Sequence, residues 1–509
     1  ATMLVMAAGV PAVGDELSLT IGTDGALRAT GGNAPTPQVI VRGYDTESLD
    51  VTVQFLGLDL ATELTDLGEV IRVSCPDTPL AGADGAPALP VVRKLFGVRP
   101  GARIDVTVDE GPTLFVDLAA LGLRGVVAPV QGYPSLAPVS GQGTRLDAER
   151  YAADAFEPAT PVNISRVGIA RGLELYLLEV RPVRYNPAQG ALAVCPQIDI
   201  ALRFDGGEDL GALATPNAGM NLAVLNPPSA ARQREGRAVN FLILTAQDFA
   251  GSAPLTQFIN AKTAQGFTVS TYTVAAGTTN ATVKAYIQSL WHTANAPDYV
   301  LIVGDAMGTT NTAVSNTVPI WRGGGSRWNY TDIPYVCLDA GDDWMPDIAI
   351  GRIPVRLVTE LQDVVDKTLY FEGGEYADPS YANRAAFLAG TDPYADAETW
   401  HNSIISTYMD PAGIESIRLY TVSYGATPQD VRDAFNEGVF LASYFGHAAG
   451  FHAWGRPAFT FEDIEGLTNE NLYPFLMSYS CSSANFDLLP DDQSPGWLEK
   501  WLTVPQKGA

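Results

Sequence analysis

The hydrophobic pattern of this chain changes near residue 238, and that change limits the folds open to it. Before this point, short segments that alternate apolar and polar residues recur, for example at 17–21, 51–55 and 104–108. A period of two is typical of β-strands with one buried face. After this point, short apolar runs alternate with segments of helical period. We therefore predict an N-terminal all-β region followed by an α/β domain with a mostly parallel sheet flanked by helices.

We divide the chain into an all-β region at 1–206, a linker at 207–237 and an α/β domain at 238–509. The linker is rich in Gly, Asn and Pro and then turns basic, with Arg234 and Arg237 near its end. Such a segment is either an ordinary linker or a processing site, because nicking concentrates in exposed loops. The linker is the safer interpretation. The last residues look like a helix that leads into another strand, so we expect the α/β domain to be incomplete at its C-terminus.

Capping and turn signals mark the elements of both regions. Thr359 starts a capping box with a Gln three residues later, and Thr427 followed by Pro428 opens another helix. In the all-β region, the run at 173–180 continues through Pro182 to 185–187 and returns at 192–195 and 198–202, which predicts a hairpin. In the α/β domain we expect helices at 253–265, 281–292 and 428–436, and strands at 241–244, 269–274, 299–303, 348–350, 386–389, 439–445 and 473–480.

Charge and cysteine content exclude several classes of function. The chain carries 31 basic and 57 acidic residues, a formal net charge of −26, which argues against nucleic acid or an anionic membrane as a partner. The four cysteines are far apart and form no CxxC pair, so a zinc cluster is not expected. No stretch reaches the ~18 apolar residues of a transmembrane helix. Residues 1–10 fit a first strand and the remnant of a secretory signal equally well.

Two apolar runs in the last quarter of the chain each stop on a reactive side chain. The run at 439–445 leads into Gly446 and His447, and the run at 473–480 leads into Cys481. Chemistry in open α/β sheets sits just outside the carboxyl ends of the strands, so neighbouring strands would bring the two side chains together. A thiolate–imidazole pair is the core of a cysteine peptidase. Taken singly, Cys481 could be a small buried hydrophobe, and His447 a hydrogen-bonded residue at a strand end.

Motifs around this pair follow a recognisable order. Gly446-His447 is followed by Ala453-Trp454-Gly455, Leu467-Thr468-Asn469, Tyr473-Pro474-Phe475 and Cys481, and the segments at 303–305 and 346–352 precede them. With these motifs, the chain from about residue 80 onward resembles the gingipain family of cysteine peptidases, whose catalytic domain has a caspase-like fold. The all-β region resembles the N-terminal propeptide of that family, most clearly at 86–90 and 185–187.

The resemblance implies roles for several residues. Cys481 would be the nucleophile and His447 the general base, and Asp347 would orient the imidazole at a position where the family often has Glu. Glu360 falls near the acidic residue of the substrate pocket, which would favour Arg or Lys at the cleaved bond, and Trp454 would contact the substrate. By its own position, Glu360 is a carboxylate in the first turn of a helix, where it stabilises the helix itself. This capping role is the favoured interpretation.

Acyl transfer also needs hydrogen-bond donors for the oxyanion. We expect the backbone N–H groups of Gly446, Ala448 and Cys481 to supply them, with Gly446 allowing the chain to turn sharply after its strand. His452 follows this turn, so we predict a place in a loop or at the pocket rim. This chemistry requires no cofactor.

An acidic stretch after Cys337 is a candidate metal site. Asp339, Asp342 and Asp343 could hold Ca²⁺, which takes clustered carboxylate and carbonyl oxygens. The stretch lacks the regular ligand spacing of a calcium loop, so a solvated acidic turn is the favoured interpretation.

These observations predict a secreted or cell-surface cysteine endopeptidase of bacterial type, made as a proenzyme. Its partners would be a protein or peptide substrate and a second polypeptide that carries the rest of the catalytic domain. One alternative keeps the Cys–His pair but passes the acyl group to an amine, as a surface-attaching transpeptidase. Another alternative is a non-catalytic structural or binding protein on a peptidase scaffold.

Overall fold

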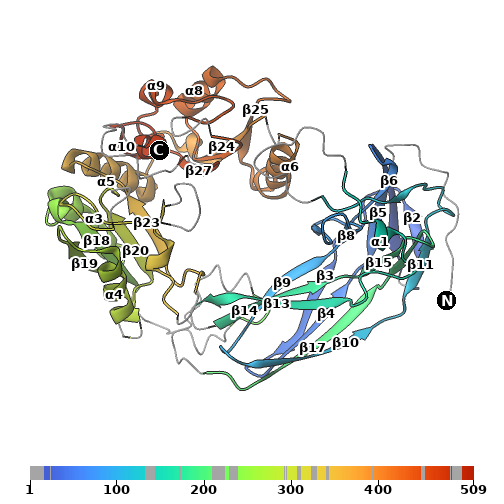
Figure 1. Ribbon diagram of the computed structural model, residues 1–509. Helices are drawn as coiled ribbons and strands as arrows, with labels where there is room; N and C mark the ends of the chain where they lie inside the picture. The colour runs from blue at the N-terminus through green and yellow to red at the C-terminus, as the bar shows by residue number, and fades with distance from the viewer. Residues whose placement is uncertain are drawn as a thin grey trace. The chain divides into compact units, whose positions relative to one another are not determined.

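The computed structural model divides the chain into two compact units, Ala1–Glu235 and Gly236–Ala509, called here the β unit and the α/β unit. The β unit is built from strands, and the α/β unit alternates strands with helices (Figure 1). This confirms the predicted fold class. The structure describes residues 16–22, 24–131, 144–170, 173–208, 224–227, 239–291, 293, 295–306, 311–322, 330–339, 343–391, 394–448, 453–481, 483 and 496–509.

The described strands of the β unit form four sheets and one short pair. One sheet has the order β12 (Val126–Val127), β6 (Gly68–Ser74), β5 (Gly57–Thr65), β1 (Glu16–Ile21), β2 (Leu27–Thr30). A second has the order β10 (Arg103–Glu110), β17 (Gln197–Asp205), β4 (Ser48–Gln54), β3 (Gln38–Tyr44). One smaller sheet has the order β11 (Leu114–Asp117), β16 (Ala191–Val194), β15 (Val183–Asn186). The other has the order β13 (Val162–Ala170), β14 (Leu173–Val180), β9 (Val92–Val98). The short pair is β7 (Leu80–Ala81) with β8 (Leu89–Pro90), and α1 spans Ala148–Tyr151.

Each larger sheet of the β unit shares a core with a smaller one, as in a β-sandwich. Leu60 and Ile71 of the five-stranded sheet cluster with Leu192 of β16. Ile200 of the four-stranded sheet clusters with Phe96 of β9. The period of two that predicted these strands reflects such one-sided burial, because every second side chain of β17 is buried.

The predicted hairpin is confirmed at its turn, where Tyr185 of β15 lies opposite Leu192 of β16, but its outer arms belong to other sheets. β14 pairs with β13 and β9, whereas the hairpin joins β15 to β16 and β17 pairs with β10 and β4. Pro182 stands between β14 and β15, and Pro196 stands directly before β17. Because proline has no N–H for a ladder, the chain leaves one sheet for another at these two points.

The described strands of the α/β unit form two parallel four-stranded sheets rather than the single sheet that we expected. The first has the order β19 (Thr268–Val274), β18 (Asn240–Ala246), β20 (Tyr299–Val303), β23 (Ala349–Ile353). The second has the order β25 (Glu415–Tyr420), β24 (Arg384–Ala389), β26 (Leu441–Phe445), β27 (Phe475–Tyr479). In both sheets the chain starts at an inner strand, adds one neighbour on one side and then builds on the other side.

Helices connect these strands and bury their apolar sides. The main helices are α3 (Ala253–Ala264), α4 (Asn280–Trp291), α5 (Val358–Gly373), α6 (Tyr394–Ile404), α8 (Pro428–Glu437), α9 (Phe461–Glu465) and α10 (Trp497–Thr503). Short segments are η2 (Gln247–Phe249), β21 (Trp321–Arg322), β22 (Tyr330–Thr331), η3 (Ile333–Tyr335), η4 (Pro379–Asn383), the π-helical η5 (Ile405–Met409) and α7 (Asp410–Ala412).

Most predicted helices of the α/β unit are present, with one correction at a cap. Thr427 and Asp430 close a capping box on α8 as their side chains accept from each other's backbone N–H. The box predicted at Thr359 is wrong, because α5 starts at Val358 and Glu360 accepts from the N–H groups just before it. The sequence pattern also missed α6 and β25. The edge position of β25 explains its weak signal, since three of its residues are only half-buried.

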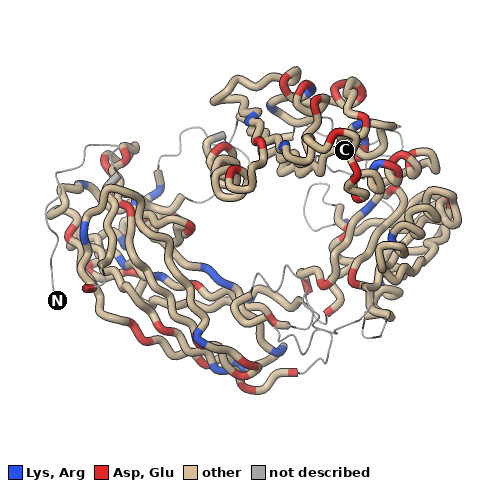
Figure 2. The backbone as a smooth tube through the Cα atoms, turned by 180° about the vertical axis from the view of Figure 1, so that it is seen from behind, with Lys and Arg blue, Asp and Glu red and all other residues tan. Residues whose placement is uncertain are grey.

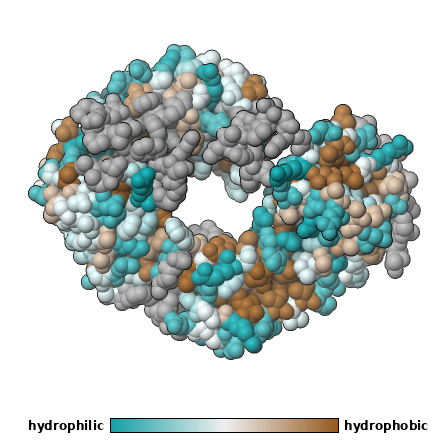
Figure 3. All heavy atoms as spheres, viewed as in Figure 1, coloured by the Kyte–Doolittle hydropathy of each residue, from teal (hydrophilic) through white to brown (hydrophobic). Residues whose placement is uncertain are grey.

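Acidic residues are spread over both units (Figure 2). Apolar residues gather in patches on the face of the β unit that Figure 3 shows. Single apolar side chains of this unit, such as Val106 and Val167, are exposed. Among the described residues, no helix combines the length and the apolar character needed to cross a membrane.

Candidate active site

The ladder between β26 and β27 determines where His447 and Cys481 lie. The two strands are parallel, and Phe445 opposite Tyr479 is their last pair in register. His447 and Cys481 each stand two positions beyond this pair. Because neighbouring strands are ~4.8 Å apart, the two residues leave the same edge of the sheet side by side.

This edge is also a switch point of the second sheet. From β24 the chain first winds to β25 on one side and then to β26 on the other. Ligands of open α/β sheets bind at such a point, outside the carboxyl ends of the strands. Gly390, directly after β24, donates its N–H to Phe445 O at 2.9 Å, which holds the two strand ends together. His447 is therefore delivered to the position where this type of sheet usually places its chemistry.

Gly446 is needed for close packing rather than for a sharp turn. It is not among the glycines with positive φ. A Cβ at this position would lie 2.6 Å from Tyr444 Oη and 3.1 Å from Gly390 Cα, which is too close for any side chain. Its N–H donates to Tyr479 O at 3.3 Å. The ladder thus uses the donor that we predicted for the oxyanion, and this corrects both roles proposed for Gly446.

The main chain of His447 is held by two donors. Tyr444 Oη and the N–H of Gly455 each donate to His447 O at 2.7 Å. Tyr444 is buried, and burial raises the pKa of its hydroxyl. The hydroxyl therefore stays protonated and able to donate.

Trp454 packs against Tyr444 and is too deeply buried to contact a substrate. Its side chain is 0% exposed and its ring stacks on Tyr444 at 4.4 Å. The indole Nε1 donates to Ser478 Oγ at 3.0 Å. The predicted substrate contact is therefore wrong, because the tryptophan belongs to an aromatic cluster with Phe459, Trp497 and Trp501.

Three serines hold the chain on both sides of Cys481, and sequence reasoning missed them. Ser478 Oγ and Ser483 Oγ each lie 3.0 to 3.4 Å from a neighbouring serine hydroxyl, with Ser480 between them. Ser483 O accepts from the N–H of Leu498 at 3.2 Å, which ties this segment to α10. The only available signal was the density of hydroxyl side chains around the cysteine.

Cys481 differs from the other cysteines in its exposure. Cys75, Cys195 and Cys337 are buried, and Cys481 is exposed. Burial raises the pKa of Cys75 to about 12 and that of Cys337 to about 11, so these thiols are poor nucleophiles. His447 is exposed as well. The interpretation of Cys481 as a buried hydrophobe is thus excluded.

Asp347 lies before the amino end of β23, in the first sheet. Its side chain is 1% exposed, and its Oδ2 accepts from the N–H of Leu338 at 2.7 Å. Carboxylate oxygens of Asp339, Asp343 and Asp347 lie within 4.8 Å of one another. The described contacts of Asp347 thus belong to the acidic stretch, and its predicted contact with His447 stays a prediction.

The acidic stretch fits both interpretations that the sequence left open. Its clustered carboxylates are the ligands that Ca²⁺ takes. However, Asp343 already accepts from the N–H groups of Asp339 and Met345 at 3.2 and 3.0 Å, as in a self-contained turn. Asp342 lies outside the described residues, as do His452, Arg234 and Arg237.

Glu360 is engaged by the backbone at the start of α5. Its Oε2 accepts from the N–H groups of Arg356 and Leu357 at 2.7 and 3.1 Å. This is the capping role that its position predicts. Its role in a substrate pocket stays a prediction. One of its two carboxylate oxygens, Oε2, already accepts these hydrogen bonds.

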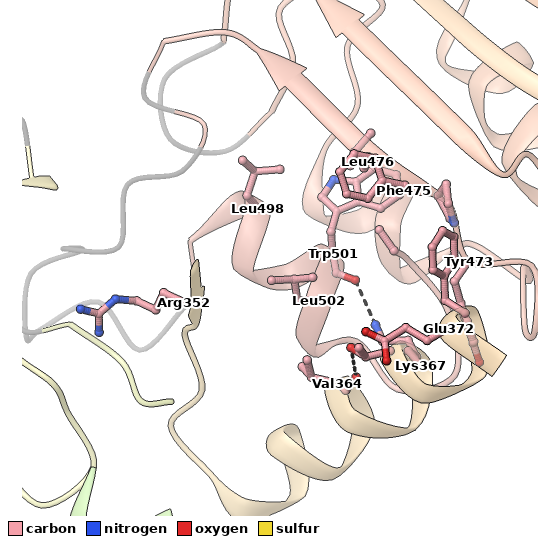
Figure 4. A pocket seen from close by; sticks show the side chains of 14 residues that line it. Arg352, Val364, Lys367, Glu372, Tyr473, Phe475, Leu476, Leu498, Trp501 and Leu502 are labelled. Carbon is pink, nitrogen blue, oxygen red and sulfur yellow. Dashed lines mark hydrogen bonds between the residues drawn. The ribbon is translucent and has the colours of Figure 1, made fainter. Parts of the chain in front are cut away.

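A mostly apolar cavity of about 530 Å³ lies at the other end of β27 (Figure 4). Its lining includes Phe475, at the amino end of the strand, with Trp501 of α10. Lys367 of α5 reaches it from below and donates to the carbonyls of Trp501, Val504 and Lys507 at 2.9 to 3.1 Å. All three ammonium protons are therefore used to cap α10. Since Cys481 follows the carboxyl end of β27, the cavity is separate from the candidate site.

Comparison with known families assigns the chain. Residues 234–509 match the model of "Peptidase family C25", and residues 34–222 match the model of its propeptide. The chain belongs to peptidase family C25. Members of this family are cysteine endopeptidases. Among curated relatives, Lys-gingipain of Porphyromonas gingivalis is 24% identical over 94% of this chain, and gingipain R2 of the same bacterium is 24% identical over 79%.

The chain spans 28% of the length of that Lys-gingipain and 54% of that gingipain R2. A solved structure of the Arg-specific cysteine proteinase gingipain R is 21% identical, with a TM-score of 0.45 over 54% of this chain and 62% of its own. Another solved structure, titled as a protease, is 23% identical with a TM-score of 0.46 over 53% of this chain and 57% of its own.

Proposed function

We propose that this chain carries the nucleophile and general base of a cysteine endopeptidase, Cys481 and His447. The observation that supports it most is the shared register of β26 and β27, which gives both residues the same place beyond the sheet edge. Membership of a family of cysteine peptidases supports it independently. The propeptide match supports synthesis as a zymogen.

The proposed reaction follows from the chemistry of the pair. A free thiol has a pKa of ~8.5, and an adjacent imidazole shifts it toward the reactive thiolate. Cys481 attacks the scissile carbonyl, and His447 protonates the leaving amine and then activates the water that releases the acyl group. The N–H groups of Cys481 and Ala448 remain as candidate donors to the oxyanion. Asp347 is proposed to orient His447, and the reaction requires no cofactor.

Cleavage after basic residues is the less supported part of the proposal. Its support is the printed names of relatives, which include Lys-gingipain and an Arg-specific cysteine proteinase. The residue proposed to confer it, Glu360, already caps α5. The similarity to gingipains of a bacterium also supports the proposal that the protein is secreted or held at a bacterial cell surface. A second polypeptide that completes the catalytic domain also stays a proposal.

The test is cleavage of a peptide library by the full-length protein, with products read by mass spectrometry. We expect the Cys481→Ala variant to lose cleavage, and His447→Ala to lose roughly 10²–10⁴-fold in rate. Cys337→Ala, which removes a buried thiol, is the matched control and should cleave normally. Products that incorporate an added amine would instead indicate a transpeptidase. Cleavage that survives in Cys481→Ala would refute the proposed nucleophile.

A latent form is separated from a non-catalytic scaffold by alkylation of the thiols. If the wild-type protein cleaves nothing, we still expect iodoacetamide to modify Cys481 first, since it is the exposed cysteine. His447→Ala should slow this modification at pH 7, because the imidazole no longer favours the thiolate. A rate unaffected by the substitution would favour the scaffold.

A further inference from the structure

Within the described part of the chain, β27 has an apolar face whose first and last side chains are exposed. Phe475, Met477 and Tyr479 alternate along the strand, so they share one face of the sheet. On the neighbouring strand, Leu441 and Phe445 pack against the core beneath α6. That cover does not extend to β27, where Phe475 and Tyr479 remain 57% and 59% exposed. Apolar side chains that form a contiguous exposed surface mark sites of interaction.

Trp400 of α6 extends this surface across β26. Its side chain is 66% exposed, and its ring centroid lies 6.4 Å from that of Phe445. The ring of Phe445 in turn lies 6.4 Å from that of Tyr479. Both pairs are edge-to-face, a geometry that aromatic rings favour. We call Trp400, Phe445 and Tyr479 the aromatic row.

The aromatic row ends beside the candidate nucleophile and base. Phe445 precedes His447 by two positions, and Tyr479 precedes Cys481 by two positions. Two residues of extended chain span ~6.6 Å, about the length of one or two substrate residues. A peptide held at Cys481 can therefore place a side chain on the row without a change in the backbone of the sheet.

We propose that the aromatic row is a substrate subsite that binds an apolar, preferably aromatic, side chain next to the scissile bond. The proposal rests on the peptidase function proposed above and specifies its substrate class. Apolar character continues along β27 beyond the row, through Met477 and Phe475. The hydroxyl of Tyr479 donates to Met477 Sδ at 3.6 Å. This polar group therefore points along β27 toward Met477.

A cationic side chain is the competing occupant, because exposed aromatic rings also attract cations. Asp396 lies one helical turn before Trp400 on α6 and could pair with such a cation. Asp396 stands in the first turn of the helix, where the helix dipole already stabilises its charge. The next acidic residue, Glu398, accepts from the N–H of Ser423 at 3.3 Å. These observations favour the apolar occupant, and the experiment separates the two.

The experiment measures equilibrium binding to the full-length Cys481→Ala protein, which cannot cleave its ligand. The probes are fluorescein-labelled pools of alanine-rich octapeptides in which one residue is Phe or, in a matched pool, Lys. We expect the Phe pool to bind on the order of tenfold more tightly than the Lys pool. Adding Trp400→Ala or Tyr479→Ala should remove most of that preference. Tyr408→Ala is the matched control, since Tyr408 is also 66% exposed.

The outcomes separate this proposal from the peptidase proposal. Binding requires neither His447 nor the thiol, so absence of cleavage in the wild-type protein leaves this measurement unaffected. Tighter binding of the Lys pool, lost in Asp396→Asn, would overturn the apolar subsite in favour of a basic one. Equal or absent binding of the Phe pool would also overturn it, as would an unchanged preference in Trp400→Ala. Thermal melting of each variant shows whether it is folded, and the two exposed aromatics are not expected to affect it.

Discussion

The carbonyl of His447 is held from two sides, by the hydroxyl of Tyr444 and the N–H of Gly455. This contact restrains the backbone of the candidate base rather than its ring. It depends on the absence of a side chain at Gly446, which lets Tyr444 Oη pass close to the main chain. The sequence pointed to His447 because a reactive residue ended an apolar run. Nothing in that run marked Tyr444 as different from the other buried strand residues.

Gly446→Ala tests this arrangement. The new Cβ would lie 2.6 Å from Tyr444 Oη, so either the tyrosine or the strand end must move. A shift of about 1 Å near the reacting groups costs roughly 10²-fold in rate, and overpacking costs roughly 1–3 kcal/mol of stability. We expect both losses, measured as kcat/KM and as urea unfolding. Gly351→Ala is the control, because a Cβ there meets nothing within 4 Å. Full activity in Gly446→Ala would show that the close approach does not matter.

At the scale of elements, α6 is joined to the second sheet through a buried histidine. His401 is 3% exposed, and its Nε2 lies 3.1 Å from Ser443 Oγ of β26. The rings of Phe387 and Tyr420 pack on it at 5.3 and 6.1 Å. Burial lowers the pKa of His401 to about 4. The helix that carries Trp400 is thus attached to the strand that leads to His447 by a group that is neutral at pH 7.

This histidine should make the α/β unit sensitive to acid. Between its ordinary pKa of 6.5 and the folded value of about 4, the unfolded chain binds a proton that the folded chain does not. Stability is therefore lost as the pH falls through this window, by up to about 3 kcal/mol for this group. His401→Gln should lose less stability than the wild type between pH 7 and pH 4.5, as measured by urea unfolding. Parallel losses in the two proteins would contradict the assignment.

At the scale of the whole α/β unit, a buried ionic network links the first sheet to α10. Arg352 of β23 pairs with Asp332 at 2.7 Å and donates to the carbonyls of Gly304 and Asp305 at 3.0 Å. Asp305 pairs with Arg356 at 2.7 Å, and Glu499 of α10 lies 4.0 Å from Arg356. The helix that ends this network also anchors Ser483, close to Cys481.

Glu499 makes the stability of the α/β unit fall as the pH rises, which is opposite to the effect of His401. Burial, followed by the charge of Asp305, raises the pKa of Glu499 to about 8. Between its ordinary pKa of 4.5 and about 8, the folded chain keeps a proton that the unfolded chain has lost, so stability falls as the pH rises. Glu499→Gln retains an acceptor for the N–H of Gly496 and does not titrate. We expect it to be more stable than wild type by about 1–3 kcal/mol at pH 9 and equally stable near pH 5. Glu375→Gln, at an exposed position, should show no such difference.

The fold class and the reactive pair could be predicted because both depend on local pattern. A period of two or of about 3.6 reports burial on one side, and an apolar run that ends in Gly-His or Ser-Cys reports a strand end. Contacts between distant segments were not predictable in this way. The capping of α10 by Lys367, the network around Arg352 and the burial of Trp454 each join parts of the chain whose separation the sequence does not reveal. The division into two sheets was missed for the same reason, since strand order is a long-range property.

The register between β26 and β27 must be kept for the site to form, whereas the length of the chain between Gly455 and β27 can vary. The stretch between Gly455 and β27 follows the contacts that hold His447, and a change in its length would leave the pairing of Phe445 with Tyr479 intact. A slip of one residue in β27 would displace Cys481 by ~3.3 Å and turn its side chain to the other face. Insertions and deletions after Gly455 and before β27 are therefore a route by which evolution or an engineer can reshape the surroundings of the site. A single residue added within either strand would separate the thiol from its base.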